Sequence, residues 1–261
     1  MGDVTEQALS SNECLQVQAV TDPNYCQLWT VIHSCPHDPI PCNESARKIG
    51  ARSTGTGTDM DFAAARDTMI ESQVRTNDVS DLALQGAMRV VERETFVVAE
   101  KRAFAYAEVT SPTPSGRWLW KPRDFSKLAQ AANALAGERV LVIAGAGGYS
   151  AAVFAALGCT VTVLDEVAVT IPGVTSVVGG LDAPPAGPFD IVFVDGGVET
   201  FPDSWTHVLA EQGRLCVVLL NGPMGTANIF TKSGSSVAGR VVFDATVPQL
   251  PGFRIAPAFA F

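Results

Sequence analysis

The sequence is poor in basic residues, and this restricts the partners that it can bind. Its 18 Lys and Arg residues are outnumbered by 27 Asp and Glu residues, which gives a formal net charge of −9. Nucleic acids and anionic membrane surfaces bind proteins through clustered Lys and Arg, so we expect neither as a partner. No apolar run approaches the roughly 18 residues of a membrane span. The first residues also lack the basic and apolar regions of a signal peptide, which predicts a cytoplasmic protein.

Cysteine is scarce outside the start of the chain. Four of the six cysteines lie in the first 42 residues: Cys14, Cys26, Cys35 and Cys42. A cytoplasmic protein keeps its thiols reduced, so we expect no disulfides. Three of these cysteines could ligate zinc together with His37, but their spacing has no C-x-x-C pair, and we expect no metal site. Cys159 and Cys216 sit in apolar stretches and are predicted to be small buried side chains.

Residues 1–59 differ in character from the rest of the chain. They have no sustained helical or strand periodicity, and they end in the Gly- and Thr-rich stretch "GARSTGTGTD". We interpret them as a disordered extension, or as an upstream stretch translated from a misassigned start. A folded N-terminal module is the alternative.

Residues 60–137 are predicted to be helical. Apolar residues recur at helical spacing in three segments: 60–76, 79–91 and 121–137. Asp61 is a suitable cap for the first of these helices, and Pro122 suits the first turn of the third. Gly137 is expected to end the third helix.

Short apolar runs alternate with helical patterns over residues 138–261. The predicted strands are 139–144, 160–166, 174–180, 189–197 and 214–220. A helix is predicted over 148–158, and a helix followed by a turn over 202–213. Such alternation indicates a parallel sheet with helices on both faces, a three-layer α/β sandwich of the Rossmann-like type. Two runs joined by Gly and Ser near the end predict a hairpin, and therefore an antiparallel final strand.

The stretch "RVLVIAGAGGYS" (139–150) places small residues directly after a buried strand. In a parallel sheet, the loop after the first strand lets the backbone approach a ligand, and an acid after the next strand binds ribose hydroxyls. Asp165 occupies that second position, 20 residues after Gly145. This arrangement predicts an adenosine-containing cofactor. A dinucleotide loop would have a third glycine where Ser150 stands, and an S-adenosylmethionine loop is the competing interpretation.

From Met60 to Phe261 the sequence resembles the protein-L-isoaspartate O-methyltransferase family, in particular its shorter bacterial branch. The stretch "RVLVIAGAGGYSAAVFA" is similar to the family's "VLDIGTGSGYSTALLA". The stretches "MIESQVRTNDVSDLALQGAMRVVERETFV", "GPFDIVFVDGGVETFPDSW", "EQGRLCVVL" and "FDATVPQLPGFRIAPAFAF" also resemble family segments, in the same order. The resemblance implies an S-adenosylmethionine-dependent methyltransferase fold with N-terminal helical additions. It also implies carboxyl methylation of isoaspartyl residues in peptides or proteins, as a repair reaction.

The resemblance also implies which residues form the site. The cofactor-binding residues would be Gly145, Gly147, Gly148, Tyr149, Asp165, Asp182 and Asp195. The substrate loop would contain Trp118, Trp120 and Pro122. No catalytic acid or base is identified, because a carboxylate is already a nucleophile and needs mainly to be positioned. We interpret His207 as a surface or packing residue.

Several positions depart from the family pattern. Val142 stands where the family has Asp, and Ala144 and Ala146 stand where it has loop glycines, although a one-residue shift would let Gly145 and Gly147 serve instead. Trp120 replaces the Ser of the family's "T-I-S-x-P" loop. Residues 165–178 leave little room for the helix that forms part of the adenine pocket. Two functions therefore stay open: a carboxyl methyltransferase, and a catalytically degenerate relative that acts as a binding or scaffold protein.

The interpretation of residues 1–59 leads to a prediction about truncation. A chain that starts at Met60 should melt within about 2 °C of the full-length protein, because the predicted core lies entirely in residues 60–261. Differential scanning calorimetry of the two chains makes the comparison. A markedly lower melting temperature after truncation, or stoichiometric zinc in the full-length protein alone, would contradict the prediction.

Overall fold

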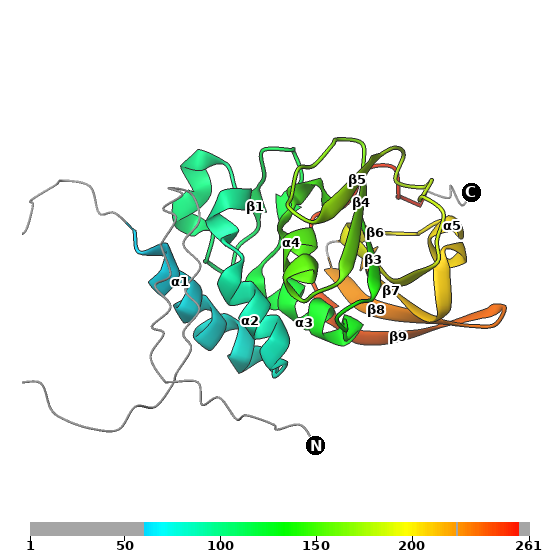
Figure 1. Ribbon diagram of the computed structural model, residues 1–261, viewed down its shortest axis with the longest axis horizontal. Coiled ribbons are helices and arrows are strands. Elements are labelled where there is room, and N and C mark those ends of the chain that lie inside the picture. Colours follow the sequence, from blue (N-terminus) through cyan, green and yellow to red (C-terminus); the bar gives the residue numbers. More distant parts are fainter. Residues whose placement is uncertain (1–59, 223, 256–261) are drawn as a thin grey trace, which may run out of the picture. The chain divides into compact units, whose positions relative to one another are not determined.

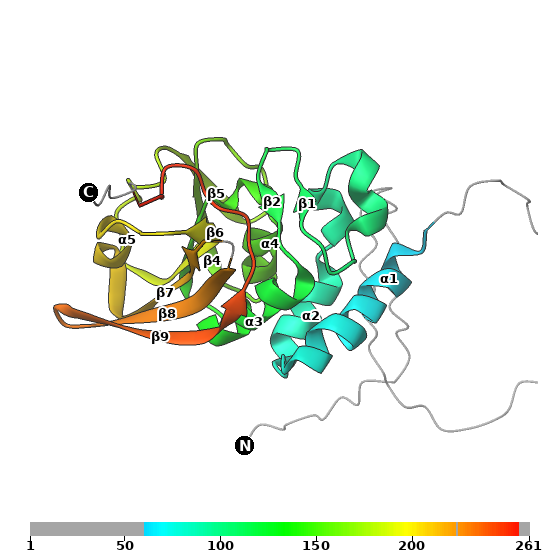
Figure 2. The same cartoon turned by 180° about the vertical axis from the view of Figure 1, so that it is seen from behind.

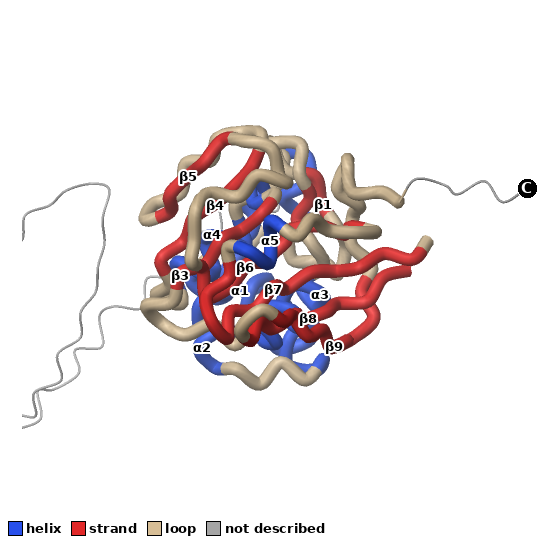
Figure 3. Tube along the Cα trace, turned by 90° about the vertical axis from the view of Figure 1, so that its right-hand side faces the viewer, coloured by secondary structure: helices blue, strands red, loops and turns tan. Residues whose placement is uncertain are grey.

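A seven-stranded mixed sheet forms the centre of the computed structural model, which describes residues 60–222 and 224–255. The strand order is β5-β4-β3-β6-β7-β8-β9 (Figures 1 and 3). The strands are β3 (Arg139–Ile143), β4 (Thr160–Asp165), β5 (Val174–Val178), β6 (Phe189–Val198), β7 (Leu209–Asn221), β8 (Met224–Ser233) and β9 (Ser236–Ala245). The first five of these strands are parallel, and β8 pairs antiparallel with both β7 and β9. The predicted parallel sheet and final hairpin are confirmed.

The strand order reverses between β3 and β6, which creates the crevice where such sheets bind ligands. Alternate side chains of β3 enter two separate cores, so Val140 and Val142 pack on one face while Leu141 and Ile143 pack on the other. Burial on both faces explains why this strand reads as a continuous apolar run rather than an alternating one.

One face of the sheet is covered by α3 (Pro122–Ala132) and α4 (Tyr149–Ala156). Pro122 starts α3 at its first turn, as predicted. The helix ends five residues before Gly137, because Asn133 adopts a left-handed conformation with φ 50°. Gly158, with φ 85°, follows the end of α4 as expected.

The helical additions before the sheet pack beside this same face (Figures 1 and 2). They comprise α1 (Phe62–Met69), a π-helix (Ile70–Val74), α2 (Leu82–Val90) and 3-10 turns at Arg75–Asn77, Arg93–Phe96 and Ala99–Phe104. The side chain of Asp61 accepts a hydrogen bond from the Ala64 amide at 3.0 Å, which confirms it as the cap of α1. A short hairpin of β1 (Ser111–Pro112) and β2 (Trp118–Leu119) then leads into α3.

The second face carries a single helix among the described residues, α5 (Ser204–His207). The predicted helix within 202–213 is therefore wrong beyond His207. The chain there joins β7 instead, and Leu209 pairs with Phe189 of β6. Trp205 is fully buried on this face, and its indole N–H donates to the Leu181 carbonyl at 2.7 Å.

The segment after β9 contributes Leu250 and Phe253 to the core of the second face. It leaves the sheet edge and returns across the ends of the parallel strands, as the red trace of Figure 2 shows. Main-chain hydrogen bonds link Gly197 to Pro248 and Leu250. The side chain of Leu250 fills the space above Gly196, where a Cβ would lie only 2.4 Å from it. The C-terminal segment is thus held directly beside the carboxyl end of β6.

Other expectations have mixed outcomes. Cys159 and Cys216 are buried with free thiols, as expected. The candidate zinc ligands of the first 42 residues, and the extension 1–59 as a whole, lie outside the described residues. Within the described part of the chain, no helix is both long and apolar enough to cross a membrane.

Candidate cofactor site at the carboxyl end of the sheet

Two residues of the loop between β3 and α4 have a positive φ, and both stand where the family pattern has a glycine. Ala144 adopts a left-handed conformation with φ 60°, which costs an alanine about 1 kcal/mol. Gly148 has φ 86°, and a Cβ there would lie 2.8 Å from the Phe96 ring. Gly145 and Gly147 have no positive φ, so the loop is not shifted to let them take over these conformations. Gly145 instead allows close packing, since its Cβ would meet Val142 at 2.7 Å.

Asp165 lies at the end of β4 with no exposed side-chain surface. Arg117 approaches it with two nitrogens, Nη2 at 2.6 Å from Oδ1 and Nε at 3.0 Å from Oδ2. The Ala146 amide donates to Oδ2 at 2.9 Å, and the Glu166 amide donates to Oδ1 at 2.7 Å. The predicted ribose acid therefore stands beside the loop, and both of its oxygens are occupied. Hydrogen bonding to Asp165 raises the pKa of Arg117, which stays positively charged.

Sequence reasoning missed Arg117. It follows the turn of the β1–β2 hairpin, where Gly116 has φ 83° and the Thr113 amide donates to the Arg117 carbonyl at 2.9 Å. This turn holds the Arg117 backbone against the cofactor loop, with its Cβ 3.7 Å from where a Gly147 Cβ would lie. The signal in the sequence was a lone cation in the otherwise apolar stretch "GRWLW".

The two tryptophans of the substrate loop point in different directions. The Trp118 residue is 46 % exposed, whereas Trp120 is 2 % exposed and its ring packs on Phe193 at a centroid distance of 6.0 Å. The Trp120 carbonyl accepts a hydrogen bond from the buried guanidinium of Arg93. Pro122 is also buried, at the start of α3. Trp120 is therefore part of the core.

Tyr149 supports the loop from within the core. Its ring is almost fully buried and packs edge-on against Phe96 and Phe125, at centroid distances of 5.9 and 5.1 Å. The guanidinium of Arg93 lies 4.8 Å from the ring centroid. Burial raises the pKa of the Tyr149 hydroxyl and lowers that of Arg93. This leaves the Tyr149 ring with little surface to offer a ligand.

Asp195 lies toward the carboxyl end of β6, across the reversal point from the loop. It accepts a hydrogen bond from the Ser150 hydroxyl at the start of α4. Burial, helped by the negative charge of Asp165, raises the pKa of Asp195 to about 7. Asp195 and Ser150 line a narrow cavity that also touches Trp118, Trp120 and Gly147. The β3–α4 loop, the end of β6 and the β1–β2 hairpin with its predicted substrate residues thus meet around this narrow cavity.

Two wider cavities lie at this end of the sheet, and the larger of them shares Gly147 with the narrow one. One, of about 440 Å³, is lined by Ala146, Gly147 and Gly148, by Pro114 and Ser115 of the hairpin turn, and by the loop 168–172. The other, of about 240 Å³, is lined by Glu166, Gly180, the exposed Asp182 and residues 251–253. The loop cavity has the size of a small-molecule site. Residues 166–173 form no helix, as their short length predicted, and the loop 168–172 lines the cavity instead.

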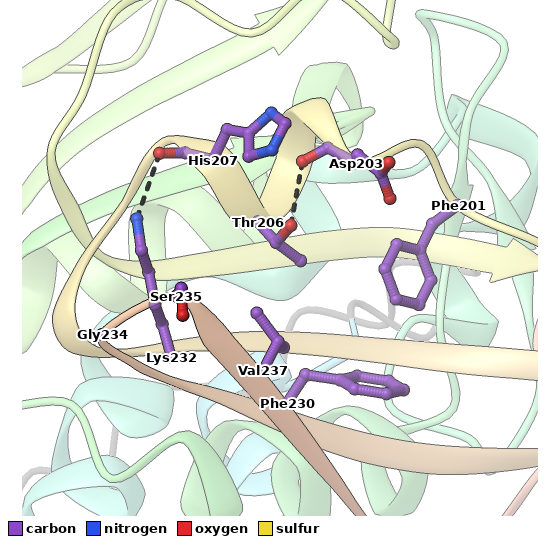
Figure 4. Close-up of a pocket in the computed structure, with 9 residues that line it drawn as sticks. All are labelled: Phe201, Asp203, Thr206, His207, Phe230, Lys232, Gly234, Ser235 and Val237. Atoms are coloured by element: carbon purple, nitrogen blue, oxygen red, sulfur yellow. Dashed lines mark hydrogen bonds between the residues drawn. The ribbon is translucent and has the colours of Figure 1, made fainter.

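A cavity of about 590 Å³ lies elsewhere, between α5 and the β8–β9 hairpin (Figure 4). Phe201, Phe230 and Val237 contribute apolar surface, and the Lys232 ammonium donates to the Leu209 carbonyl at 2.9 Å. His207 is exposed at the rim, in agreement with a surface residue. None of the predicted site residues lines this cavity.

Comparison with known proteins agrees with this geometry. The family model described as Protein-L-isoaspartate(D-aspartate) O-methyltransferase matches residues 64–171. Protein-L-isoaspartate O-methyltransferase 1 of Rhodopseudomonas palustris (strain HaA2) is 32% identical over 210 residues, which cover 75% of this chain and 83% of that protein. Protein-L-isoaspartate O-methyltransferase of Methylorubrum populi is 31% identical over 175 residues, which cover 62% of this chain and 82% of the relative.

Solved structures show the same fold. A protein-L-isoaspartate O-methyltransferase structure from Plasmodium falciparum, in complex with S-adenosyl-L-homocysteine, matches with a TM-score of 0.60 at 16% sequence identity. The match covers 71% of this chain and 97% of that one. A further structure of a protein-L-isoaspartate O-methyltransferase also has a TM-score of 0.60, at 20% identity, and covers 72% of this chain and 66% of its own. The chain belongs to the protein-L-isoaspartate O-methyltransferase family.

Proposed function

We propose that this protein binds S-adenosylmethionine at the β3–α4 loop and transfers its methyl group to a carboxylate of a peptide or protein. The observation that carries the proposal is the carboxylate of Asp165, which sits at the end of β4 and bonds the loop amide of Ala146. Acceptor oxygens at this place in a parallel sheet suit the hydroxyls of an adenosine ribose. The adjoining cavity of about 440 Å³ provides room for a ligand of this class.

The residues present fit the cofactor on one condition. Asp165 offers the two acceptor oxygens that a ribose diol needs, but Arg117 uses both of them. Gly147 and Gly148 keep the inner wall of the cavity free of side chains. The cofactor therefore fits if the Arg117 side chain moves, while the loop and β4 stay in place.

Bound S-adenosylmethionine supplies an electrophilic methyl group on a sulfonium. The substrate carboxylate oxygen forms the new bond to that methyl as the carbon–sulfur bond breaks, and no proton changes place. The protein's task is thus to hold the carboxylate in line. Burial raises the pKa of Asp195 to about 7, so near pH 7 this carboxyl is partly neutral and adds less negative charge to the site than a fully ionised one.

We infer that activity on an ordinary isoaspartyl peptide is weak. Ala144 and Ala146 replace loop glycines, Val142 replaces an Asp, and the buried Trp120 offers no hydroxyl near the substrate. An indole cannot replace the donor and acceptor pair of a serine hydroxyl. Each change that weakens positioning by 1.36 kcal/mol lowers the rate about tenfold.

A second function remains a candidate. The chain could be a degenerate family member that serves as a binding or scaffold protein. In such a protein, a cation of the chain itself would stay paired with Asp165 permanently. The two contacts from Arg117 to Asp165 favour this possibility. Cofactor binding distinguishes the two functions.

The first prediction concerns cofactor affinity. Titration calorimetry should detect binding of S-adenosylhomocysteine. Asp165→Ala should weaken it about 10- to 100-fold, because the hydrogen bonds of a charged acceptor to ribose are lost. The control is Asp190→Ala. Asp190 lies at the amino end of β6, far from the carboxyl ends of the strands where the site lies, so this substitution should leave the affinity unchanged. Absence of heat at millimolar ligand would support the degenerate relative, and heat with NAD instead would indicate a dinucleotide protein.

The second prediction concerns the chemistry. Transfer of tritium from labelled S-adenosylmethionine to a standard isoaspartyl peptide should be very slow or undetectable, and Trp120→Ser should not rescue it, because the cofactor loop is altered too. This substitution removes a core indole and should lower stability by about 3 to 5 kcal/mol. The exposed Trp118→Ser is the matched control for loss of a tryptophan. A wild-type turnover rate typical of a repair enzyme would refute the prediction.

A further inference from the structure

We propose that Arg117 competes with the cofactor ribose for Asp165, so that binding of S-adenosylmethionine must displace Arg117 and release the hairpin that carries it. The inference rests on the proposed function, and it assigns to Arg117 a role in setting cofactor affinity. Arg117 would be a positioning residue, since it acts through Asp165 and through the hairpin.

The hydrogen bonds of Asp165 leave no acceptor position free for a ribose hydroxyl. A carboxylate has about four acceptor positions, and here each oxygen receives one main-chain amide and one nitrogen of Arg117. A ribose with two hydroxyls would need two of these positions. The amides of Ala146 and Glu166 belong to the loop and to the end of β4, and they cannot leave without unfolding the site. The guanidinium is the only one of the three partners that rotation of a side chain can remove.

Glu166 provides a second carboxylate with which the displaced guanidinium can pair. Nη2 of Arg117 also lies 3.3 Å from Oε2 of Glu166, whose side chain is 62 % exposed. Arg117 itself keeps 13 % of its side chain exposed. A rotation toward Glu166 would keep the cation paired with a carboxylate while it leaves the buried one. The cost of moving it is thereby limited.

The hairpin depends on the same guanidinium. The side chain of Arg117 fastens the turn between β1 and β2 to the end of β4, and the Thr113 hydroxyl donates to the Arg117 carbonyl at 2.9 Å. Pro114 and Ser115 of the same turn line the cavity beside the loop. Removal of the guanidinium from Asp165 takes away the buried ion pair between this turn and the end of β4 and leaves only the pair with the exposed Glu166, which holds the turn more weakly. Cofactor binding should therefore loosen the turn and widen the cavity.

Competition predicts that loss of Arg117 improves binding. A ligand that must first break a buried ion pair binds more weakly than one that meets a free carboxylate. Arg117→Gln should therefore bind S-adenosylhomocysteine at least about tenfold more tightly than the wild type does. Arg117→Lys, which keeps the charge but cannot form the two-nitrogen contact, should fall between the two.

Titration calorimetry with S-adenosylhomocysteine tests this on the full-length chain. The matched control is Arg214→Gln, because Arg214 is also a partly buried arginine, with 19 % exposure and an ion pair to Glu138 at 2.8 Å. It lies at the amino end of the strands and should leave the affinity unchanged. Hydrogen exchange of the wild type is the second measurement. Competition predicts that exchange in residues 111–119 becomes faster when the ligand binds, whereas a purely structural role of Arg117 predicts no change.

The outcomes separate the inference from the proposed function. Tighter binding by Arg117→Gln, with faster exchange in the hairpin of the liganded wild type, supports the competition. Binding by the wild type that Arg117→Gln weakens or leaves unchanged overturns the competition alone and makes Arg117 a cofactor contact or a structural residue. Absence of binding by the wild type and by all the variants overturns the proposed function and the competition together.

Discussion

A buried carboxylate, that of Asp165, determines how the carboxyl end of the sheet is arranged. A charge without solvent is costly unless it is paired and hydrogen bonded. Here the loop amide of Ala146, the amide of Glu166 and the guanidinium of Arg117 provide that compensation. The same contacts fix the loop after β3 and anchor the substrate hairpin. The carboxylate that we propose to bind the ribose is therefore also the group that holds the loop and the hairpin together.

The chain has the fold of its family, although several residues of the cofactor and substrate segments depart from the family pattern. Ala144 accepts the left-handed conformation that a glycine adopts without strain, so the turn survives the substitution at a cost of about 1 kcal/mol. Trp120, which stands where the family pattern has a Ser, is buried in the core, where Phe193 contacts its ring. The protein thus has the fold of the family with different residues at these positions.

Much of the fold could be predicted from the sequence because its signals are local. Buried apolar runs gave the strands, and the spacing from Gly145 located Asp165 at the end of β4. The helix expected within 202–213 failed because Leu209 pairs with Phe189, a contact that helical spacing cannot reveal. Arg117 was missed for the same reason, since its partner lies 48 residues away. The direction of Trp120 and the raised pKa of Asp195 also depend on packing between distant segments.

We propose above all that Asp165 binds the cofactor ribose and that Arg117 must leave it for the cofactor to bind. A crystal structure of the full-length protein with S-adenosylhomocysteine tests this claim most directly. We predict that the ribose hydroxyls lie within hydrogen-bonding distance of both Asp165 oxygens, and that the Arg117 guanidinium has turned toward Glu166. A complex in which Arg117 still contacts both Asp165 oxygens, with the ligand bound elsewhere, would contradict the claim.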